Sequence, residues 1–327
     1  MFIKIIKSNQ PAVLIFLIII CSLLWIKTFI FQDITELSPE NIRMPLYDLF
    51  YTLLSKNKII LISSGLLILI IQSLYLARLN YKYIFLEGRT YITSVIFILI
   101  SGSVLELQWF HPAIPGSLAL TFAIDKIFYS YRKEKALSLF FDASFIISVG
   151  SLFYFNIIYF MIIVWVSLII LRTFNWREWF VTITGLITPY ILVCSYYYIF
   201  DDIVYVKDML FSNLHSCSIE ISTDITYIIY FAFLLLLVII SIFSMFSKLG
   251  LKKVSTRKYF SIIFWVFLFS LVFTLLLPSM FIDGLVIIAV PASYIISSYF
   301  ISMRSKWWGD IFLLIWIGLL IYIQVVK

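Results

Sequence analysis

Residues 226–246 read TYIIYFAFLLLLVIISIFSMF, a run of 21 residues without a single charge. A helix of about 20 mainly apolar residues spans the hydrocarbon core of a bilayer, and similar runs recur along the whole chain. Of the 327 residues 63% are hydrophobic and 13% are charged, against roughly 45–50% and 25% in soluble domains. The sequence therefore predicts an all-α polytopic membrane protein. It excludes a soluble enzyme, a disordered protein and a secreted disulfide domain.

We expect about eleven transmembrane helices and no soluble domain, so that residues 1–327 form a single membrane domain. The predicted spans are 12–32, 58–77, 90–107, 112–130, 138–154, 156–172, 179–200, 226–246, 259–279, 284–302 and 310–326. The pair 138–154 and 156–172 is short, and only a turn at Asn156 separates its members. A re-entrant hairpin is the alternative, and it returns the chain to the same face as two full spans do.

The basic residues orient the chain. With the N-terminus in the cytoplasm, the inner segments carry 18 of the 24 Lys and Arg residues. Positive charge is retained on the cytoplasmic side, which predicts an N-in, C-out topology. Since the basic residues follow this pattern, the net charge of +7 indicates no nucleic-acid partner. Eleven of the 17 acidic residues, Asp283 among them, are predicted outside. Their role is either solvation of the loops or contact with an outer ligand.

Several classes of chemistry are excluded by what the sequence lacks. Two histidines are too few for a multi-histidine metal centre, and three scattered cysteines form no disulfide or zinc framework. No predicted span has a charge near its centre, and no internal repeat is visible. Ion-coupled transporters usually have a charge at mid-membrane, and many have repeated halves. A small-solute transporter is therefore disfavoured.

The first outer loop, 33–57, has a polar part and an amphipathic part. The polar part contains three carboxylates and one base: Asp33, Glu36, Glu40 and Arg43. In 45–57 the apolar residues fall at helical spacing: Leu46, Leu49, Phe50, Leu53 and Leu54. The opposite side of this helix carries Asp48, Thr52 and Lys56. This pattern is typical of a helix that lies in the membrane interface.

Two further outer loops carry candidate groups. The shorter one brings Glu106, Trp109 and His111 to the same surface, and the loop 201–225 begins with Asp201-Asp202 and contains His215. A carboxylate in such a place is able to act as a general base or to hold a divalent ion beside a phosphate. Loop solvation is the simpler interpretation of each acidic residue.

The layout resembles the GT-C superfamily of membrane glycosyltransferases, which use polyprenyl-phosphate sugars. The similar parts are Phe31-Gln32-Asp33 after the first span, the segment from Met44 to Phe50, and the turn Ala77-Arg78-Leu79-Asn80. The stretch from Tyr131 to Arg172 is similar to the paired short helices of that family. The likeness covers roughly the first 200 residues. The paired Asp-Glu of many members is absent, because Ile34 follows Asp33, and so is their soluble C-terminal domain.

This resemblance implies transfer of a sugar from a polyprenyl-phosphate donor at the outer face of the inner membrane. Asp33 would be the catalytic base or a ligand of a divalent metal ion, and Arg43 would contact the donor phosphate. The expected auxiliary residues are Glu36, Glu40, Glu106 and His111. Membrane lipids and membrane proteins are the expected partners.

The chain also resembles a family of bacterial multi-spanning inner-membrane proteins with no assigned activity. The shared features are Asn175-Trp176-Arg177-Glu178-Trp179 and the helix with Gly185, Pro189 and Tyr190. Arg177 would bind a lipid phosphate or a partner's carboxylate, and an ordinary positively charged loop is the simpler interpretation. This likeness supports the alternative function, a non-catalytic scaffold or lipid-handling subunit of an envelope assembly complex.

Overall fold

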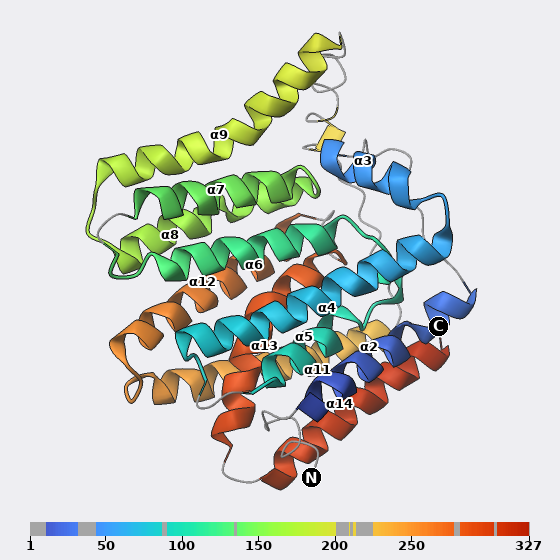
Figure 1. Ribbon diagram of the computed structural model, residues 1–327. Coiled ribbons are helices and arrows are strands. Elements are labelled where there is room, and N and C mark those ends of the chain that lie inside the picture. The colour runs from blue at the N-terminus through green and yellow to red at the C-terminus, as the bar shows by residue number, and fades with distance from the viewer. Residues whose placement is uncertain are drawn as a thin grey trace.

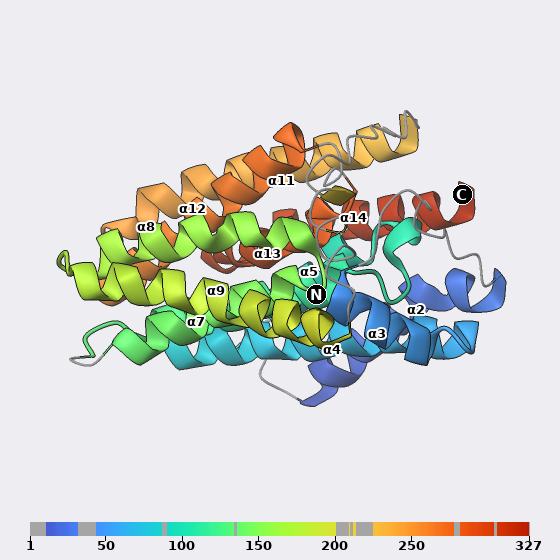
Figure 2. The ribbon, with the colours of Figure 1, turned by 90° about the horizontal axis from the view of Figure 1, so that it is seen from above.

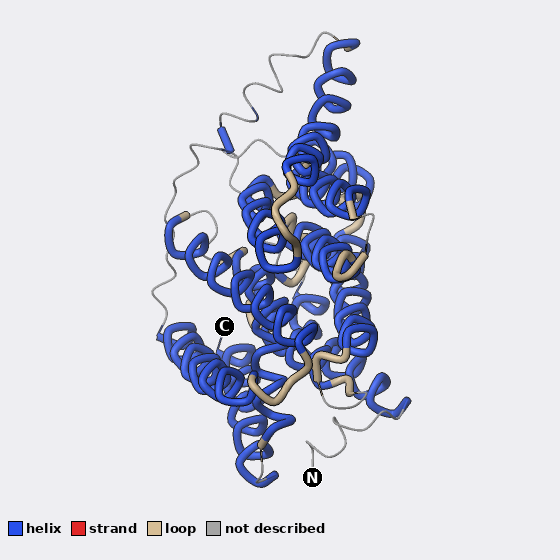
Figure 3. The backbone as a smooth tube through the Cα atoms, turned by 90° about the vertical axis from the view of Figure 1, so that its left-hand side faces the viewer, coloured by secondary structure: helices blue, strands red, loops and turns tan. Residues whose placement is uncertain are grey.

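The computed structural model describes residues 11–31, 44–86, 90–133, 136–200, 209, 212–213, 225–277, 282–303 and 306–326. Within these ranges all regular structure is helical, and Figure 3 shows helices and loops but no strand. The α-helices are α2 (Pro11–Phe31), α3 (Pro45–Leu54), α4 (Lys58–Tyr83), α5 (Ile92–Ser101), α6 (Ala113–Tyr129), α7 (Leu137–Ser151), α8 (Met161–Leu171), α9 (Trp176–Ile199), α11 (Ile225–Leu249), α12 (Val254–Leu276), α13 (Gly284–Ser302) and α14 (Lys306–Val326). The 3₁₀ helices are η1 (Leu105–Leu107) and η2 (Phe155–Phe160).

The all-α prediction is confirmed for the described part of the chain, and a helix overlaps each of the eleven predicted segments. Six of the described helices are long and apolar enough to cross a membrane: α4, α9, Tyr227–Leu249 of α11, α12, α13 and Trp307–Val325 of α14. The shorter apolar helices are Leu17–Phe31, Ile92–Ser101, Leu137–Ser151 and Phe155–Leu171. These helices are consistent with a multi-pass membrane protein.

The long helices run side by side along one direction, from α9 at one edge to α14 at the other (Figure 1). At the centre is α13, which is buried over most of its length. It packs against α5, α6, α11 and α12. Figure 2 shows α11 and α12 on one side of α13 and α4 on the other. The hairpin of α7 and α8 packs between α6 and α9. Its α7, with 15 residues, is about 22 Å long, less than the roughly 30 Å of a bilayer core.

The bundle has two chemically different ends. We call one the α3 end, because α3 lies there together with the loop 102–112 and the start of α13 (Figure 1). At the other, the basic end, the loop 130–133 contacts Arg172, shortly before α9, and Lys258 of α12. Lys and Arg dominate these loops, as the predicted charge asymmetry requires.

A helix occupies residues 45–54 within the predicted amphipathic segment 45–57. Pro45 at its first position needs no backbone N–H partner, which suits a helix start. Leu49 and Leu53 are exposed, and the buried anchor is Tyr47, which the apolar pattern did not single out. The α3 helix is therefore fixed by an aromatic residue on its protein side, Leu46 and Leu54 pack partly against the core, and Leu49 and Leu53 face outward.

Gly65 lets α4 approach the loop that carries His111. A Cβ atom at this position would collide with the carbonyl group of Trp109 and lie 3.0 Å from the Phe110 nitrogen. These are backbone atoms that cannot rotate away. The glycine therefore sets the depth at which residues 109–111 sit on α4.

We expect Gly65→Ala to lower the free energy of unfolding by about 1–3 kcal/mol, the usual cost of overpacking. Chemical denaturation of the detergent-solubilised protein measures this change. Gly318→Ala in α14 is the matched control, because nothing lies within 4 Å of its added Cβ, and alanine has the better helix propensity. Equal stability of the two variants would contradict the role given to Gly65.

Candidate functional site

His111 and Asp283 meet at the α3 end. The Nε2 atom of His111 lies 3.4 Å from Oδ1 of Asp283. The Nδ1 atom of His111 accepts a hydrogen bond from the backbone N–H of Ala113 at 3.3 Å. An acceptor nitrogen carries no proton, so a neutral imidazole has its proton on Nε2 and directs it at the carboxylate. Both ring nitrogens of His111 are therefore engaged within the protein.

Tyr154, in the turn between α7 and η2, completes this group. Its hydroxyl donates a hydrogen bond to the Asp283 carboxylate and accepts one from Nδ2 of Asn156 at 3.1 Å. We call His111, Tyr154, Asn156 and Asp283 the Asp283 cluster. Three distant parts of the chain meet in it, and two donors converge on a single carboxylate.

The Asp283 carboxylate is more accessible to solvent than the His111 imidazole. The Asp283 side chain is 19% exposed and that of His111 is 6% exposed. Burial raises the pKa of Asp283, and the nearby His111 and the Tyr154 hydrogen bond oppose part of the rise. Burial also lowers the pKa of His111, against the opposing charge of Asp283. Asp283 is therefore the member suited to exchange a proton with a ligand, and His111 positions it.

The α3 helix connects the two loops that supply His111 and Tyr154. The Tyr47 hydroxyl donates a hydrogen bond to the Phe110 carbonyl at 3.1 Å, and the two rings stack at 5.7 Å. The Tyr47 backbone N–H reaches the Leu152 carbonyl at 3.4 Å. Movement of α3 would therefore disturb both sides of the Asp283 cluster.

An apolar groove of about 640 Å³ lies beneath α3, between α4, α6 and α7. Phe50 and Leu54 of α3 line it, together with Leu67, Leu118, Phe122, Phe145 and Val149 from the three longer helices. Phe110 and Phe153 also line the groove, and they directly precede His111 and Tyr154 in the chain. The groove therefore leads from the apolar flank of the bundle to the loops of the Asp283 cluster.

A second apolar groove, of about 360 Å³, lies between α11, α12 and α13. Its lining includes Leu285, two residues after Asp283, and Thr274 near the end of α12. Two apolar grooves on different helices thus reach the α3 end of the bundle.

The predicted site residues divide into three groups. Glu106 and His111 lie in one loop at the α3 end, where Trp109 links them: its Nε1 donates to the Glu106 carbonyl at 2.8 Å, and its ring meets His111 edge-on. Arg177 is exposed at the opposite, basic end and is not brought together with them. Asp33, Glu36, Glu40 and Arg43 lie outside the described residues, as do Asp201, Asp202 and His215.

Asp283 and Tyr154 were not predicted as site residues. Asp283 counted only as one outer acidic residue, and Tyr154 fell inside a predicted span. The sequence signal that could have identified Asp283 was its position directly before α13, at the same predicted membrane face as His111. Among the described residues no three His, Cys, Asp or Glu side chains gather as metal ligands.

The motif around Arg177 has a structural role in the turn before α9. The Asn175 side chain accepts a hydrogen bond from the Arg177 N–H at 3.2 Å and caps the helix. Glu178 pairs with Arg172 at 2.8 Å. Further along α9, the Tyr190 hydroxyl lies 2.7 Å from Ser151 Oγ, and Gly185 allows close contact with Phe141 of α7. These contacts fix α9 on its neighbours.

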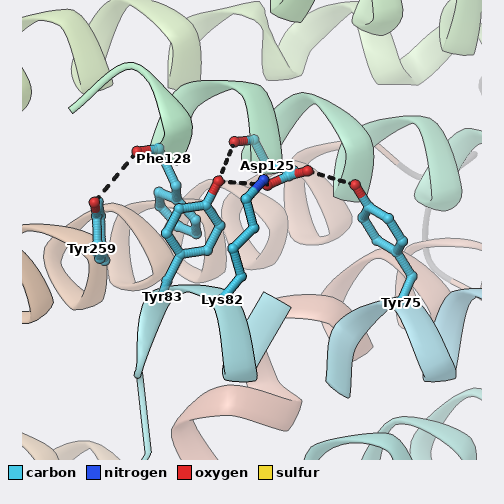
Figure 4. Close-up of polar contacts among 6 residues, drawn as sticks. All are labelled: Tyr75, Lys82, Tyr83, Asp125, Phe128 and Tyr259. Atoms are coloured by element: carbon cyan, nitrogen blue, oxygen red, sulfur yellow. Dashed lines mark hydrogen bonds and ion pairs between the residues drawn. The ribbon is translucent and has the colours of Figure 1, made fainter. Parts of the chain in front are cut away.

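A second carboxylate, Asp125 of α6, lies near the basic end (Figure 4). It accepts hydrogen bonds from the hydroxyls of Tyr75 and Tyr83, each at 2.6 Å, and pairs with Lys82 at 2.8 Å. All three donors belong to α4. Since its oxygens are already taken by the protein, Asp125 joins α4 to α6 and is a structural group.

Comparisons of the chain with protein-family models, with curated proteins and with solved structures found no match. The assignment of function therefore depends on the geometry of the α3 end.

We expect Asp125→Asn to lower the free energy of unfolding by about 1.5–3 kcal/mol, the range for hydrogen bonds to a charged group. Asp142→Asn is the control. It breaks the Lys126–Asp142 pair, whose side chains are both 40% exposed, and such pairs contribute roughly 0–1 kcal/mol. Chemical denaturation of both variants in detergent measures the difference. A larger loss for Asp142→Asn would refute the structural role of Asp125.

Proposed function

We propose that this protein is a membrane glycosyltransferase of GT-C type, which moves a sugar from a polyprenyl-phosphate donor to an acceptor hydroxyl. The observation that supports the proposal is the apolar groove beneath α3, which leads to the loops of the Asp283 cluster. An amphiphile with a long apolar chain and a polar head matches this arrangement. Its chain would lie in the groove, and its phosphate and sugar would lie at the α3 end.

In this proposal Asp283 is the general base of the transfer. Its carboxylate takes the proton of the acceptor hydroxyl, and the acceptor oxygen forms a bond to the anomeric carbon of the sugar. The bond from that carbon to the phosphate oxygen breaks, and polyprenyl phosphate leaves with the electron pair. His111 and Tyr154 orient the carboxylate, so they are positioning residues. The second groove would hold the apolar part of a lipid-linked acceptor.

Asp33 remains in the proposal as a ligand of the divalent ion instead of as the base, and the predicted roles of Glu36, Glu40 and Arg43 remain unchanged. Asp33 follows Thr28 by five residues, and the Thr28 hydroxyl donates to Gln108 Oε1 at 2.6 Å. The end of α2 therefore contacts the loop of Glu106 and His111. A divalent ion bound by carboxylates of the first loop is the candidate cofactor.

We expect polyprenyl phosphate to bind to the purified protein in nanodiscs, as measured by native mass spectrometry. Leu118→Trp should weaken this binding at least tenfold, because an indole ring at the lining of the groove takes the space of the lipid chain. Leu236→Trp is the matched control, since Leu236 is exposed on α11 and lines neither groove. Equal loss in both variants would count against the groove as the lipid site.

Asp283→Asn should leave polyprenyl-phosphate binding unchanged, while sugar transfer falls by about 10²–10⁴-fold, as expected for loss of a general base. The pKa of Asp283 is raised, and only the deprotonated carboxylate acts as a base. As the pH is lowered, wild-type transfer should therefore begin to decline at a higher pH than with an aspartate of ordinary pKa. Unchanged transfer with Asp283→Asn would remove the catalytic assignment. Lipid binding without any transfer by the wild type would support the non-catalytic, lipid-handling subunit.

We propose further that the chain crosses a bacterial inner membrane about eleven times, with the pair 138–154 and 156–172 forming either two spans or a re-entrant hairpin, and with the N-terminus in the cytoplasm and the C-terminus outside. This proposal is supported by the basic residues gathered at one end and by Asp283, His111 and Glu106 at the other. It places the Asp283 cluster at the outer face, where lipid-linked sugars serve as donors for envelope glycans.

Cysteines introduced one at a time test this topology with a membrane-impermeant thiol reagent on intact cells, in a background without Cys21, Cys194 and Cys217. A cysteine at 255, beside the basic end, should be shielded until lysis, because positive loops are retained inside. A cysteine at 56, after α3, should react. Labelling at 255 in intact cells would reverse the orientation.

A further inference from the structure

Two basic loops meet at the basic end of the bundle. Residues 130–136 and 248–258 contain eight of the 24 Lys and Arg residues of the chain and a single acidic residue, Glu134, which lies outside the described part. The eight are Arg132, Lys133, Lys135, Lys248, Lys252, Lys253, Arg257 and Lys258. The positive-inside pattern accounts for basic loops in general, but it does not require two distant loops to lie together.

Tyrosine rings hold cations of the two loops against each other. The Arg132 guanidinium lies 5.3 Å from the centroid of the Tyr131 ring, and Lys258 Nζ lies 5.5 Å from the same centroid. The Tyr131 ring also meets Tyr259 edge-on at 5.7 Å. Arg132 and Lys258 are therefore at most about 11 Å apart, and two cations from distant segments share one ring.

Tyr129 is shared in the same way. Its ring has Lys82 Nζ at 4.9 Å and Lys133 Nζ at 4.8 Å from the centroid. Lys82 is neutralised by Asp125, whereas Lys133 has no ion pair with any described residue. Arg132 and Lys258 also form no ion pair with any described residue. We call Arg132, Lys133, Lys258, Tyr129 and Tyr131 the headgroup surface.

Local structure makes this concentration of charge less favourable. Lys253 directly precedes α12, where the helix dipole disfavours a cation. Arg132 has a φ of 60°, a left-handed conformation that usually belongs to glycine or asparagine after a helix. The long charged side chain of Arg132 thus stands at a backbone conformation that favours glycine. A bound anion would offset the electrostatic part of these costs.

The side chains around these cations indicate that the anion belongs to a lipid. Leu251 is 90% exposed next to Lys252, and Val254 is 51% exposed next to Lys253. Tyr129 is 45% exposed. Apolar and aromatic side chains that alternate with cations fit the boundary between lipid headgroups and acyl chains, whereas a soluble polyanion would not cover them.

We infer that the headgroup surface binds the phosphate headgroup of an anionic phospholipid, with the phosphate between the loops 130–133 and 252–258. The charge of the phosphate would neutralise Arg132, Lys133 and Lys258, and the acyl chains would extend along the apolar flank beside Leu251 and Val254. This binding site lies at the end of the bundle opposite the Asp283 cluster, and it does not depend on the glycosyl-transfer proposal.

The test is a titration of the delipidated full chain in neutral detergent with phosphatidylglycerol or phosphatidylcholine, followed by native mass spectrometry. The wild type should bind phosphatidylglycerol more tightly. The double variant Arg132→Gln/Lys258→Gln should lose roughly fivefold in phosphatidylglycerol affinity for each removed charge, about 25-fold in all, with phosphatidylcholine binding unchanged. Gel filtration verifies that each variant is folded.

The double variant Lys56→Gln/Lys58→Gln changes the net charge equally but lies at the α3 end, outside the headgroup surface, and it should bind phosphatidylglycerol like the wild type. An equal loss in both double variants would mean that only net charge matters and would overturn the site. Wild-type affinity in Arg132→Gln/Lys258→Gln would also overturn it. Displacement of the lipid by an equal concentration of inorganic phosphate would show that the surface takes a free anion instead of a phospholipid.

Discussion

A polar group buried between apolar helices must find its hydrogen-bond partner inside the protein, because the hydrocarbon core of a membrane supplies none. This constraint sets the register of the bundle. Gln72 Nε2 of α4 donates to Thr121 Oγ1 of α6 at 3.0 Å, and the Tyr294 hydroxyl of α13 donates to the Leu76 carbonyl at 2.8 Å. The Ser148 hydroxyl of α7 reaches the Leu186 carbonyl of α9 at 2.6 Å. Each bond fixes the height of one helix against the next, which dispersion between apolar side chains alone would leave free to slide.

The same constraint separates the two carboxylates at the ends of the bundle. The Asp125 carboxylate accepts hydrogen bonds from three side chains of α4, and its role is to hold α4 and α6 together. Asp283 receives its donors from two separate loops and keeps 19% of its side chain exposed. A carboxylate held by two neighbours and open on one side is arranged for exchange with a ligand. Residues close in the chain to Asp283 or to its two donors line two apolar grooves, which is the basis for the proposed amphiphilic ligand.

The two ends thus differ in the chemistry they present. At the α3 end, apolar grooves reach loops that carry a carboxylate and a neutral imidazole. At the basic end, cations that form no ion pair with a described residue are held on tyrosine rings. In a membrane this division would place the proposed transfer chemistry at one surface and the attraction to anionic headgroups at the other. The central helix α13 connects them, because it begins directly after Asp283 and ends at the basic side.

The sequence by itself determined the helices, because a helix satisfies its own backbone and its apolar length is a local property. A helix overlaps each of the eleven predicted segments, α3 lies within the expected 45–57, and the loop with Glu106 and His111 was found from its residue types. The tertiary structure alone decided the partners. His111 meets Asp283, Tyr47 anchors α3, and Arg132 shares a ring with Lys258. Which helix faces which depends on side-chain packing between distant segments, and such packing has no signature in local hydropathy.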